Sequence, residues 1–199
     1  MSIRQRSRLR RRLFALLAAG LGGIAAAAIS FAMAVYDAAT PNQVPVVAPG
    51  EPVDTGRWVV TIHEAYLSPI PPTGTKPFEP DTFLVLEFDL DNRSAATSNA
   101  FHELISIEKP SPAALPGPTY YLARDKWIAS AINPNMPERL IAVWELSSGT
   151  PVPQSLQLKL RREIYKQRDN LYGSPGWFED GAAAMVELAV TQGRKGAPL

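Results

Sequence analysis

The chain of 199 residues contains no cysteine. This absence excludes disulfide bonds, thiolate catalysis, cysteine metal sites and the lipidated cysteine of a bacterial lipoprotein. A folded domain in this chain must therefore be held together by its hydrophobic core. A region of about 140 residues can bury enough surface to fold without covalent cross-links.

Histidine is almost as scarce, because the chain contains only His63 and His102, each followed by a glutamate. A zinc-protease helix needs a second histidine four residues after the first, but Leu67 and Ser106 occupy those positions. The sequence also lacks the glycine-flanked serine of a hydrolase elbow, a phosphate-binding glycine loop and a dinucleotide fingerprint. We therefore expect no catalytic residues, no metal site and no cofactor site, and we do not expect an enzyme.

Basic residues are concentrated at the N-terminus. Residues 1–12 carry six arginines and no acidic residue, and without these arginines 14 basic residues face 19 acidic ones, a net charge of −5. An acidic domain is a poor nucleic-acid binder, because lysine and arginine neutralise the phosphates and supply most of that affinity. We therefore expect no nucleic-acid partner.

Residues 13–36 carry no charge at all. Twenty-four residues of helix are about 36 Å long, which is enough to cross a hydrocarbon core of about 30 Å. Arginine-rich flanks stay on the cytoplasmic side of a membrane. The sequence therefore predicts a basic cytoplasmic tail over residues 1–12 and a transmembrane helix or signal anchor over residues 13–36. The C-terminal domain would then be extracytoplasmic, on a single-pass protein of the cell membrane.

A cleaved signal peptide is an alternative to the retained anchor. Ala32-Met33-Ala34 has the small-x-small pattern of a cleavage site, and cleavage near Ala34 would release a secreted domain. The apolar region of a signal peptide usually spans about 7 to 15 residues, so the longer stretch favours retention. The segment Arg11–Phe14 also resembles a twin-arginine export signal. All three interpretations export the domain.

The remainder of the chain has the pattern of a linker and a β-domain. Four prolines and a glycine indicate an extended linker over residues 37–55. From residue 56 to residue 192, short alternating segments are separated by turns, which predicts an all-β sandwich, and residues 193–199 form a C-terminal tail. The clearest strand segments are 58–66, 83–91, 140–146, 156–161 and 185–191, and the weaker ones are 101–107, 119–123 and 127–132.

Aromatic residues are divided between strands and a loop. Trp58 and Trp144 are in phase with apolar strand faces, so both are expected in the core, and Tyr66 falls on the face of Trp58. Residues 166–181 have the composition of a polar loop. Exposed aromatic residues in such a loop can anchor a partner or a sugar, or the loop can fold back over the end of the sandwich. The binding candidates in this loop are Tyr172, Trp177 and Phe178.

Three carboxylates, those of Glu87, Asp89 and Asp91, alternate along one strand face about 7 Å apart. Such a row could bind a cation or flank a glycosidic bond, although its spacing matches no calcium loop. A solvated outer face, paired with basic residues of a neighbouring strand, accounts for the same pattern. We keep Asp89 and Asp91 as candidate binding residues. The expected basic partners are Lys159, Arg161 and Arg162.

The order of these segments resembles a known family. A basic tail, an anchor and a proline-rich spacer, followed by Gly56–Ile62 and Phe83–Ser94, are similar to the telokin-like, immunoglobulin-like extracellular domains of bacterial membrane proteins. The turn Asn133–Arg139, which leads into Val143–Leu146, is similar to one in actinobacterial members. The resemblance covers residues 56–190. It implies a fold and no activity, because many of these domains have no known function and the family supplies no catalytic residues.

We therefore expect a non-catalytic, membrane-anchored, extracytoplasmic binding or interaction domain of the bacterial cell envelope. Its expected partners are the membrane itself and an envelope or membrane protein. Two alternatives remain open at this point. The chain could be an accessory subunit of a membrane transporter, with the anchor as its docking element. It could also be an exported hydrolase that uses carboxylates such as Glu87, Asp89 or Glu145.

Overall fold

The structure, a computed structural model, describes residues 23, 27–36, 44–75, 82–110, 115–147, 149–171 and 173–193. The chain divides into two units, Met1–Gln43 and Val44–Leu199. The first unit is helical at residue 23 and over residues 27–36. No helix within these described ranges has both the length and the apolar character needed to cross a membrane. The predicted basic tail and most of the predicted span lie outside the described residues.

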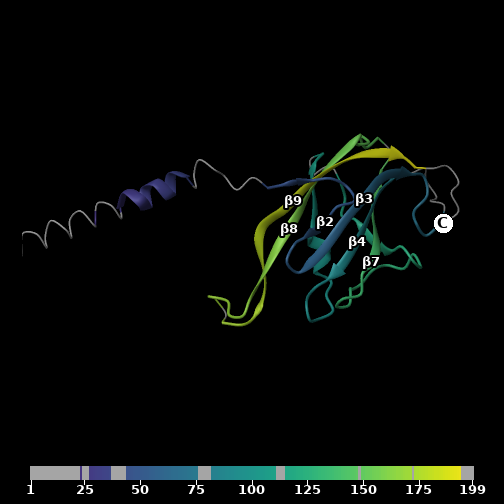
Figure 1. Cartoon of the computed structure of the whole chain (residues 1–199). Coiled ribbons are helices and arrows are strands. Elements are labelled where there is room, and N and C mark those ends of the chain that lie inside the picture. The colour runs from purple at the N-terminus through teal and green to yellow at the C-terminus, as the bar shows by residue number, and fades with distance from the viewer. Residues whose placement is uncertain are drawn as a thin grey trace, which may run out of the picture. The chain divides into compact units, whose positions relative to one another are not determined.

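The second unit is built from β-strands (Figure 1). Its described residues form β1 (Val46–Val47), β2 (Pro52–Asp54), β3 (Trp58–Ser68), β4 (Thr82–Asn92), the 3-10 helix η1 (Ala100–Glu103), β5 (Ile105–Lys109), β6 (Thr119–Leu122), β7 (Glu138–Leu146), β8 (Ser155–Lys166) and β9 (Gly176–Gln192). The strands pair in the order β5-β8-β9-β3-β4-β7-β6, with β1 on β9 and β2 on β3. The expected all-β architecture is confirmed.

The long strand β9 connects two layers. It is antiparallel to β8 along most of its length and parallel to β3 over residues 190–192. One layer therefore contains β5, β8 and β9, and the other contains β3, β4, β7 and β6. Between them lies one core, to which Trp58, Phe88 and Leu140 contribute from one layer and Leu158 and Val186 from the other. These five side chains are at most 1% exposed, so the unit is a β-sandwich closed by apolar burial.

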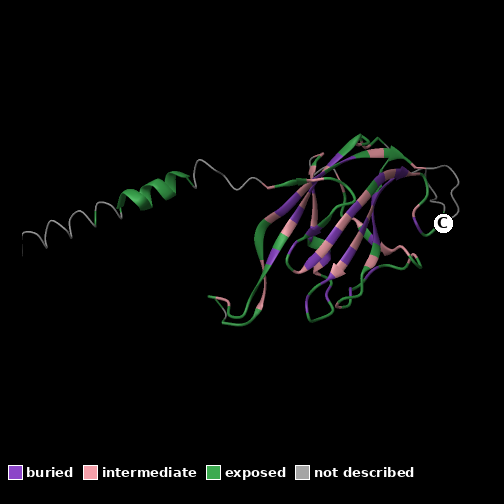
Figure 2. Ribbon diagram, in the orientation of Figure 1, coloured by how far each residue is buried: buried purple, intermediate pink, exposed green. Residues whose placement is uncertain are grey.

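The alternation of β3 and β4 explains which residues enter the core. Buried residues alternate with partly exposed ones along β3 and along β4 from Leu86 onward, whereas Phe83–Leu86 are all buried (Figure 2). The register of β3 against β4 shifts between Ile62 and Glu64, which marks a β-bulge. The extra residue reverses the alternation, so Ala65 is buried and Tyr66 lies on the outer face. The expectation that Tyr66 shares the core face of Trp58 is therefore wrong, whereas the burial of Trp58 and Trp144 is confirmed.

The predicted linker over residues 37–55 includes residues that belong to the folded unit. The folded unit begins at Val44. Val46 and Val47 pair with β9, and residues 52–54 pair with β3, with Pro52 opposite Thr61. Proline is tolerated in such short edge strands because no further strand needs its missing amide hydrogen. Residues 37–43 lie outside the described residues.

Two other boundaries differ from the sequence-based expectation. The predicted loop over residues 166–181 is mostly strand, because β8 continues to Lys166 and β9 begins at Gly176. This part of the β8–β9 hairpin has few buried residues, so it lacks the apolar alternation by which a half-buried strand is recognised. Residues 127–132, predicted as a weak strand, make only isolated bridges at Ile128 and Ile132.

The strand pairings show which strand starts and strand ends lie together at one end of the sandwich. Val60 pairs with Leu90, and Leu90 pairs with Glu138, so β3 and β7 begin where β4 ends. Because β9 is parallel to β3 and β1 is parallel to β9, these strands begin there too. β6 and β8 end there, since they are antiparallel to β7 and β9. We call this the proximal end, because the chain enters the unit there, and the opposite one the distal end.

Candidate functional site

The acidic row on β4 lies on the outer face of its sheet, as expected, but its partners differ from those expected. Arg139 of β7 donates two hydrogen bonds to Asp89, from Nε to Oδ1 (2.7 Å) and from Nη2 to Oδ2 (3.1 Å). The bulged residue His63 places Nε2 2.7 Å from Asp89 Oδ2. The hydroxyl of Tyr66 donates to Glu87 Oε1 at 3.0 Å. Each contact comes from a strand next to β4.

Asp91 and the basic residues of β8 also have partners other than those expected. Arg93 Nη1 lies 3.3 Å from Asp91 Oδ2. Lys159 pairs with Glu108 at 2.8 Å, and Arg161 pairs with Glu103 at 2.9 Å. The expectation that Lys159, Arg161 and Arg162 neutralise the acidic row is therefore wrong. The register explains the difference, because the neighbours of β4 are β3 and β7, whereas β8 lies in the other layer.

These contacts determine what the acidic row can do chemically. The hydrogen bonds from Arg139 hold the pKa of Asp89 below its ordinary value, and His63 acts in the same direction. Asp89 is thus an ionised, hydrogen-bonded carboxylate, whereas a general acid requires a raised pKa. In the described part of the chain, no group of three histidine or acidic side chains is arranged to hold a metal ion.

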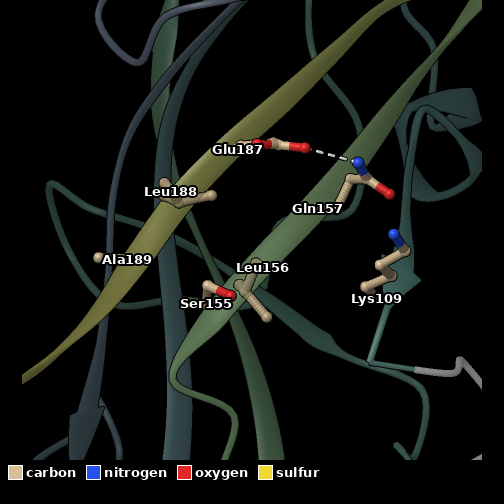
Figure 3. Close-up of a pocket in the computed structure, with 7 residues that line it drawn as sticks. All are labelled: Lys109, Ser155, Leu156, Gln157, Glu187, Leu188 and Ala189. Carbon is tan, nitrogen blue, oxygen red and sulfur yellow. Dashed lines mark hydrogen bonds between the residues drawn. The ribbon is translucent and has the colours of Figure 1, made fainter.

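A shallow depression of about 320 Å³ lies on the β5-β8-β9 layer (Figure 3). Its lining residues are Lys109, Ser155, Leu156, Gln157, Glu187, Leu188 and Ala189. Gln157 Nε2 donates to Glu187 Oε1 at 2.7 Å, so the lining amide and carboxylate already satisfy each other.

The aromatic candidates Trp177 and Phe178 lie on a two-stranded extension that we call the arm. The arm consists of residues 161–182, which form the end of β8, the turn and the start of β9, and it projects beyond the rest of the sandwich (Figure 1). Trp177 pairs with Tyr165, and their ring centroids are 5.4 Å apart. Phe178 pairs with Ile164 on the other face. The candidate Tyr172 lies outside the described residues.

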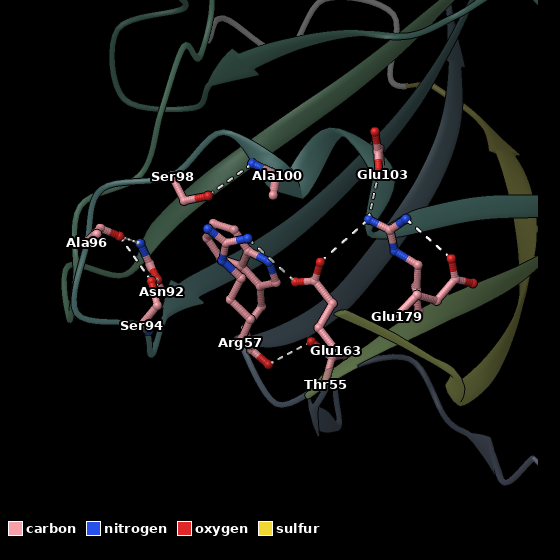
Figure 4. A network of polar contacts seen from close by, with 12 residues as sticks. Thr55, Arg57, Asn92, Ser94, Ala96, Ser98, Ala100, Glu103, Glu163 and Glu179 are labelled. Atoms are coloured by element: carbon pink, nitrogen blue, oxygen red, sulfur yellow. Dashed lines mark hydrogen bonds and ion pairs between the residues drawn. The ribbon is translucent and has the colours of Figure 1, made fainter. Parts of the chain in front are cut away.

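A network of charged side chains holds the base of the arm (Figure 4). Glu163 is buried and lies within ion-pair distance of Arg57 (4.0 Å) and Arg161 (3.6 Å). Arg161 also contacts Glu179 at 3.8 Å. The Glu163 amide donates to the Thr55 carbonyl at 2.8 Å, so main chain and side chain both tie the arm to the turn before β3.

The indole of Trp177 completes this network. The guanidinium carbon of Arg57 lies 5.8 Å from the Trp177 ring centroid and 5.6 Å from that of Trp58, which is the range of cation–π contacts. Trp177 therefore packs on the base of the arm, and only part of its ring is accessible. The segment that carries Trp177 is nevertheless a strand of the projecting arm and not a loop over the end of the sandwich.

A second buried polar residue organises the loops of the proximal end. Asn92 is fully buried, and its Nδ2 donates to the carbonyls of Ala96 (2.9 Å) and Ile132 (2.8 Å). Its Oδ1 accepts from the amide (2.9 Å) and hydroxyl (2.6 Å) of Ser94 (Figure 4). Its carbonyl accepts from the amide of Asn135 at 2.8 Å. One side chain thus connects the loop after β4 to the loop before β7.

Sequence reasoning missed the most exposed aromatic residue in the described part of the second unit. Trp127 is 75% exposed and the adjacent Ile128 is 66% exposed. The Trp127 amide donates to Asp125 Oδ1 (3.0 Å), and its carbonyl accepts from the Leu122 amide (2.8 Å). Lys126 has a φ of 61°, in the left-handed region that L-residues seldom adopt. A well-bonded turn therefore holds the indole outward.

A signal for this turn exists in the sequence. Three consecutive charged residues, Arg124, Asp125 and Lys126, separate the apolar segment 119–123 from Trp127. Such a charged run between apolar segments is typical of a turn, and it would have placed Trp127 at an exposed tip.

Comparisons with known proteins add little to this site. No family model matches the sequence, and no curated protein matches it. Among solved structures, the chain is similar to an uncharacterised β-sandwich protein from Clostridium difficile 630, with 11% sequence identity and a TM-score of 0.42. That match covers 70% of this chain and 96% of the other. The resemblance to telokin-like extracellular domains therefore stays a prediction.

Proposed function

We propose that this chain is a membrane-anchored, extracytoplasmic binding module with an immunoglobulin-like sandwich and no catalytic activity. The observation that carries the proposal is the uneven distribution of exposed apolar side chains. Of the nine large hydrophobic residues exposed in the described part of the second unit, only Ile70 and Val152 lie at the distal end. The other seven lie beside β6, before β7, on β1 and on the arm, and they are Trp127, Ile128, Met136, Val46, Ile164, Tyr165 and Leu171. Clusters of exposed apolar residues mark interaction surfaces.

The absence of a catalytic arrangement among the described residues supports a binding role over a hydrolytic one. The carboxylates proposed for a hydrolase are engaged, since Glu87 accepts from Tyr66 and Asp89 binds Arg139. The pKa of Asp89 is lowered by its hydrogen bonds to Arg139, whereas a general acid buried in an apolar pocket has a raised pKa. An aromatic anchor on a rigid turn, as at Trp127, is instead typical of the centre of a binding surface.

The N-terminal unit supports the anchor. Six arginines precede the uncharged stretch, which is the charge distribution of a cytoplasmic flank. Where the helix is described, its apolar side chains are exposed, among them Ile29, Phe31, Met33 and Val35. Side chains of this kind require an apolar environment other than the interior of their own unit.

The absence of native cysteine permits a direct test of topology. A Val152→Cys variant places one thiol on the exposed distal loop, and a Ser2→Cys variant places one in the basic tail. In intact spheroplasts, a membrane-impermeant maleimide should label Val152→Cys at once and Ser2→Cys only after lysis. The reverse pattern, or release of the whole chain by alkaline carbonate, would contradict the proposed anchorage.

The binding role needs its own experiment. A photo-crosslinking amino acid at position 128 should yield adducts with membrane or envelope components when cells are irradiated, and the same residue at position 152 should yield few. A single recurrent membrane-protein adduct would favour a transporter accessory subunit. Equal yields at the two positions would contradict a binding surface around Trp127.

A further inference from the structure

We propose that an internal water molecule is bound at the base of the arm, where it links the buried carboxylate of Glu163 to the guanidinium of Arg57. The water donates a hydrogen bond to Glu163 Oε2 and accepts one from Arg57 Nε. This inference goes beyond the proposed binding role and does not depend on the anchor. It assigns the contact between these two side chains to a bound water instead of a direct ion pair.

A group of buried polar atoms without partners is the first support. In the described part of the chain, five buried side-chain nitrogen or oxygen atoms have no hydrogen-bond partner. Four of them belong to residues at the base of the arm, and they are Arg57 Nε, Trp58 Nε1, Arg161 Nε and Glu163 Oε2. Buried polar atoms are nearly always hydrogen-bonded, either to protein or to ordered water. Their concentration at one place indicates that a small polar ligand completes the network.

The distances between the charged groups give the second support. Arg57 and Glu163 point toward one another, but Arg57 Nη1 is 4.0 Å from Glu163 Oε2 (Figure 4). A direct hydrogen bond between such groups is about 2.7 to 2.9 Å long. A longer polar contact can be bridged by a water that bonds to both groups. Because the Glu163 side chain is only 8% exposed, bulk solvent does not hydrate Oε2, and a bound water has to do so.

The surroundings of the two side chains keep this gap open. The Arg57 guanidinium is in contact with the indole rings of Trp58 and Trp177, at 5.6 and 5.8 Å from their centroids. The main chain of Glu163 is already in contact with the turn before β3, since its amide donates to the Thr55 carbonyl at 2.8 Å. A direct ion pair would require the guanidinium to leave the rings, and these contacts are favourable. A bridging water satisfies both charged groups without that movement.

The chemistry of the unpartnered atoms selects water over an ion. Three of the four are N–H donors, which cannot coordinate a cation. The fourth is a carboxylate oxygen, which repels an anion. Water is neutral, and it both donates and accepts hydrogen bonds. Globular proteins contain on the order of one internal water per 27 residues, typically bonded to buried polar groups that have no other partner.

Water-selective NMR on the full-length chain in detergent micelles tests the inference. The Nε–H signal of Arg57 is identified in a nitrogen-15-labelled sample by its loss in Arg57→Lys. We expect it to show a nuclear Overhauser contact with water, of the sign that marks a long-lived neighbour, and rotating-frame spectra separate this contact from proton exchange. Arg93, whose side chain is 56% exposed, is the control, and its Nε–H should show exchange alone.

Substitutions of Glu163 show whether the carboxylate holds the water. Glu163→Gln keeps a side-chain oxygen and should keep the water contact of Arg57, whereas Glu163→Met has a similar length and no such acceptor and should reduce it severalfold. Glu179→Gln, at a largely exposed contact of Arg161, should leave it unchanged. A wild-type chain without the water contact at Arg57 overturns the inference, and so does a contact that persists in folded Glu163→Met. If Glu163→Met does not fold, the wild-type spectrum decides alone.

Discussion

Arg139 and Asp89 lie directly opposite each other on β7 and β4 and are joined by two hydrogen bonds, of 2.7 and 3.1 Å. The pair is formed across a gap of 50 residues in the chain. His63 reaches the same carboxylate because a β-bulge displaces β3 between Ile62 and Glu64. The acidic row of β4 is therefore part of an ionic cross-strand cluster on the outer face.

This relationship predicts a specific pH dependence. The folded pKa of Asp89 lies below its unfolded value of about 3.9, so its contribution to stability is complete above about pH 4 and is lost as the pH falls through the folded pKa. Asp89→Asn should cost about 0.5 kcal/mol of unfolding free energy at pH 7, because the pair is partly solvated. The variant should also lose less unfolding free energy than the wild type as the pH falls below about 4. Urea unfolding between pH 2 and pH 7 measures both effects. If Asp89→Asn lost as much unfolding free energy at low pH as the wild type, the stabilising role of the Asp89–Arg139 pair would be contradicted. An Arg139→Gln variant should reproduce most of the reduced pH dependence.

The turn before β3 requires glycine for a steric reason. A Cβ atom at Gly56 would lie 1.9 Å from the Glu163 carbonyl oxygen, and its φ is +91°. We expect Gly56→Ala to destabilise the fold by at least about 3 kcal/mol, since the arm would have to move. Gly50→Ala is the matched control, because Gly50 has a φ of +90° but no atom within 4 Å of the added carbon. It should cost about 1 kcal/mol, and equal losses of unfolding free energy would argue against the steric explanation.

The buried amide of Asn92 is expected to contribute strongly to stability. Asn92→Ala leaves the carbonyl of Ile132 without its side-chain donor and the amide of Ser94 without its acceptor. We predict a loss of about 2 to 4 kcal/mol in unfolding free energy, measured by urea denaturation. Asn99→Ala, at an exposed position whose side chain caps nothing, should change stability by less than about 0.5 kcal/mol. Faster hydrogen exchange in residues 132–135 of Asn92→Ala would locate the effect.

Two of the three glutamates that contact Arg161, Glu163 and Glu179, should differ in importance. Glu163 is buried, so Glu163→Ala leaves Arg57 and Arg161 without their shared buried carboxylate and should cost about 3 kcal/mol. Glu179 is largely exposed, and Glu179→Ala should cost less than about 1 kcal/mol. Thermal or urea unfolding gives the comparison. If both substitutions were equally mild, the network would not be what holds the arm on the sandwich.

Local patterns along the chain were sufficient for the all-β architecture and for much of the core. Alternation predicted β3, β4, β7 and the first half of β8, and it predicted that Trp58 and Trp144 are buried, because a strand with one face in the core must be apolar at every second residue. The same reasoning placed the carboxylates Asp89 and Asp91 on an outer face. The lack of cysteine likewise implied a domain held by its core alone.

Properties that depend on pairing between distant segments emerged only in the folded chain. The partner of Asp89, the reversal of alternation at Tyr66 and the strand character of Trp177 all follow from register, which is a relation between segments far apart in sequence. The arm has no alternating apolar face, so its backbone-paired strands cannot be recognised from the pattern of its side chains. The connection that Asn92 makes between the loop after β4 and the loop before β7 has the same origin, because the pairing of distant strands decides which loops share an end of the sandwich.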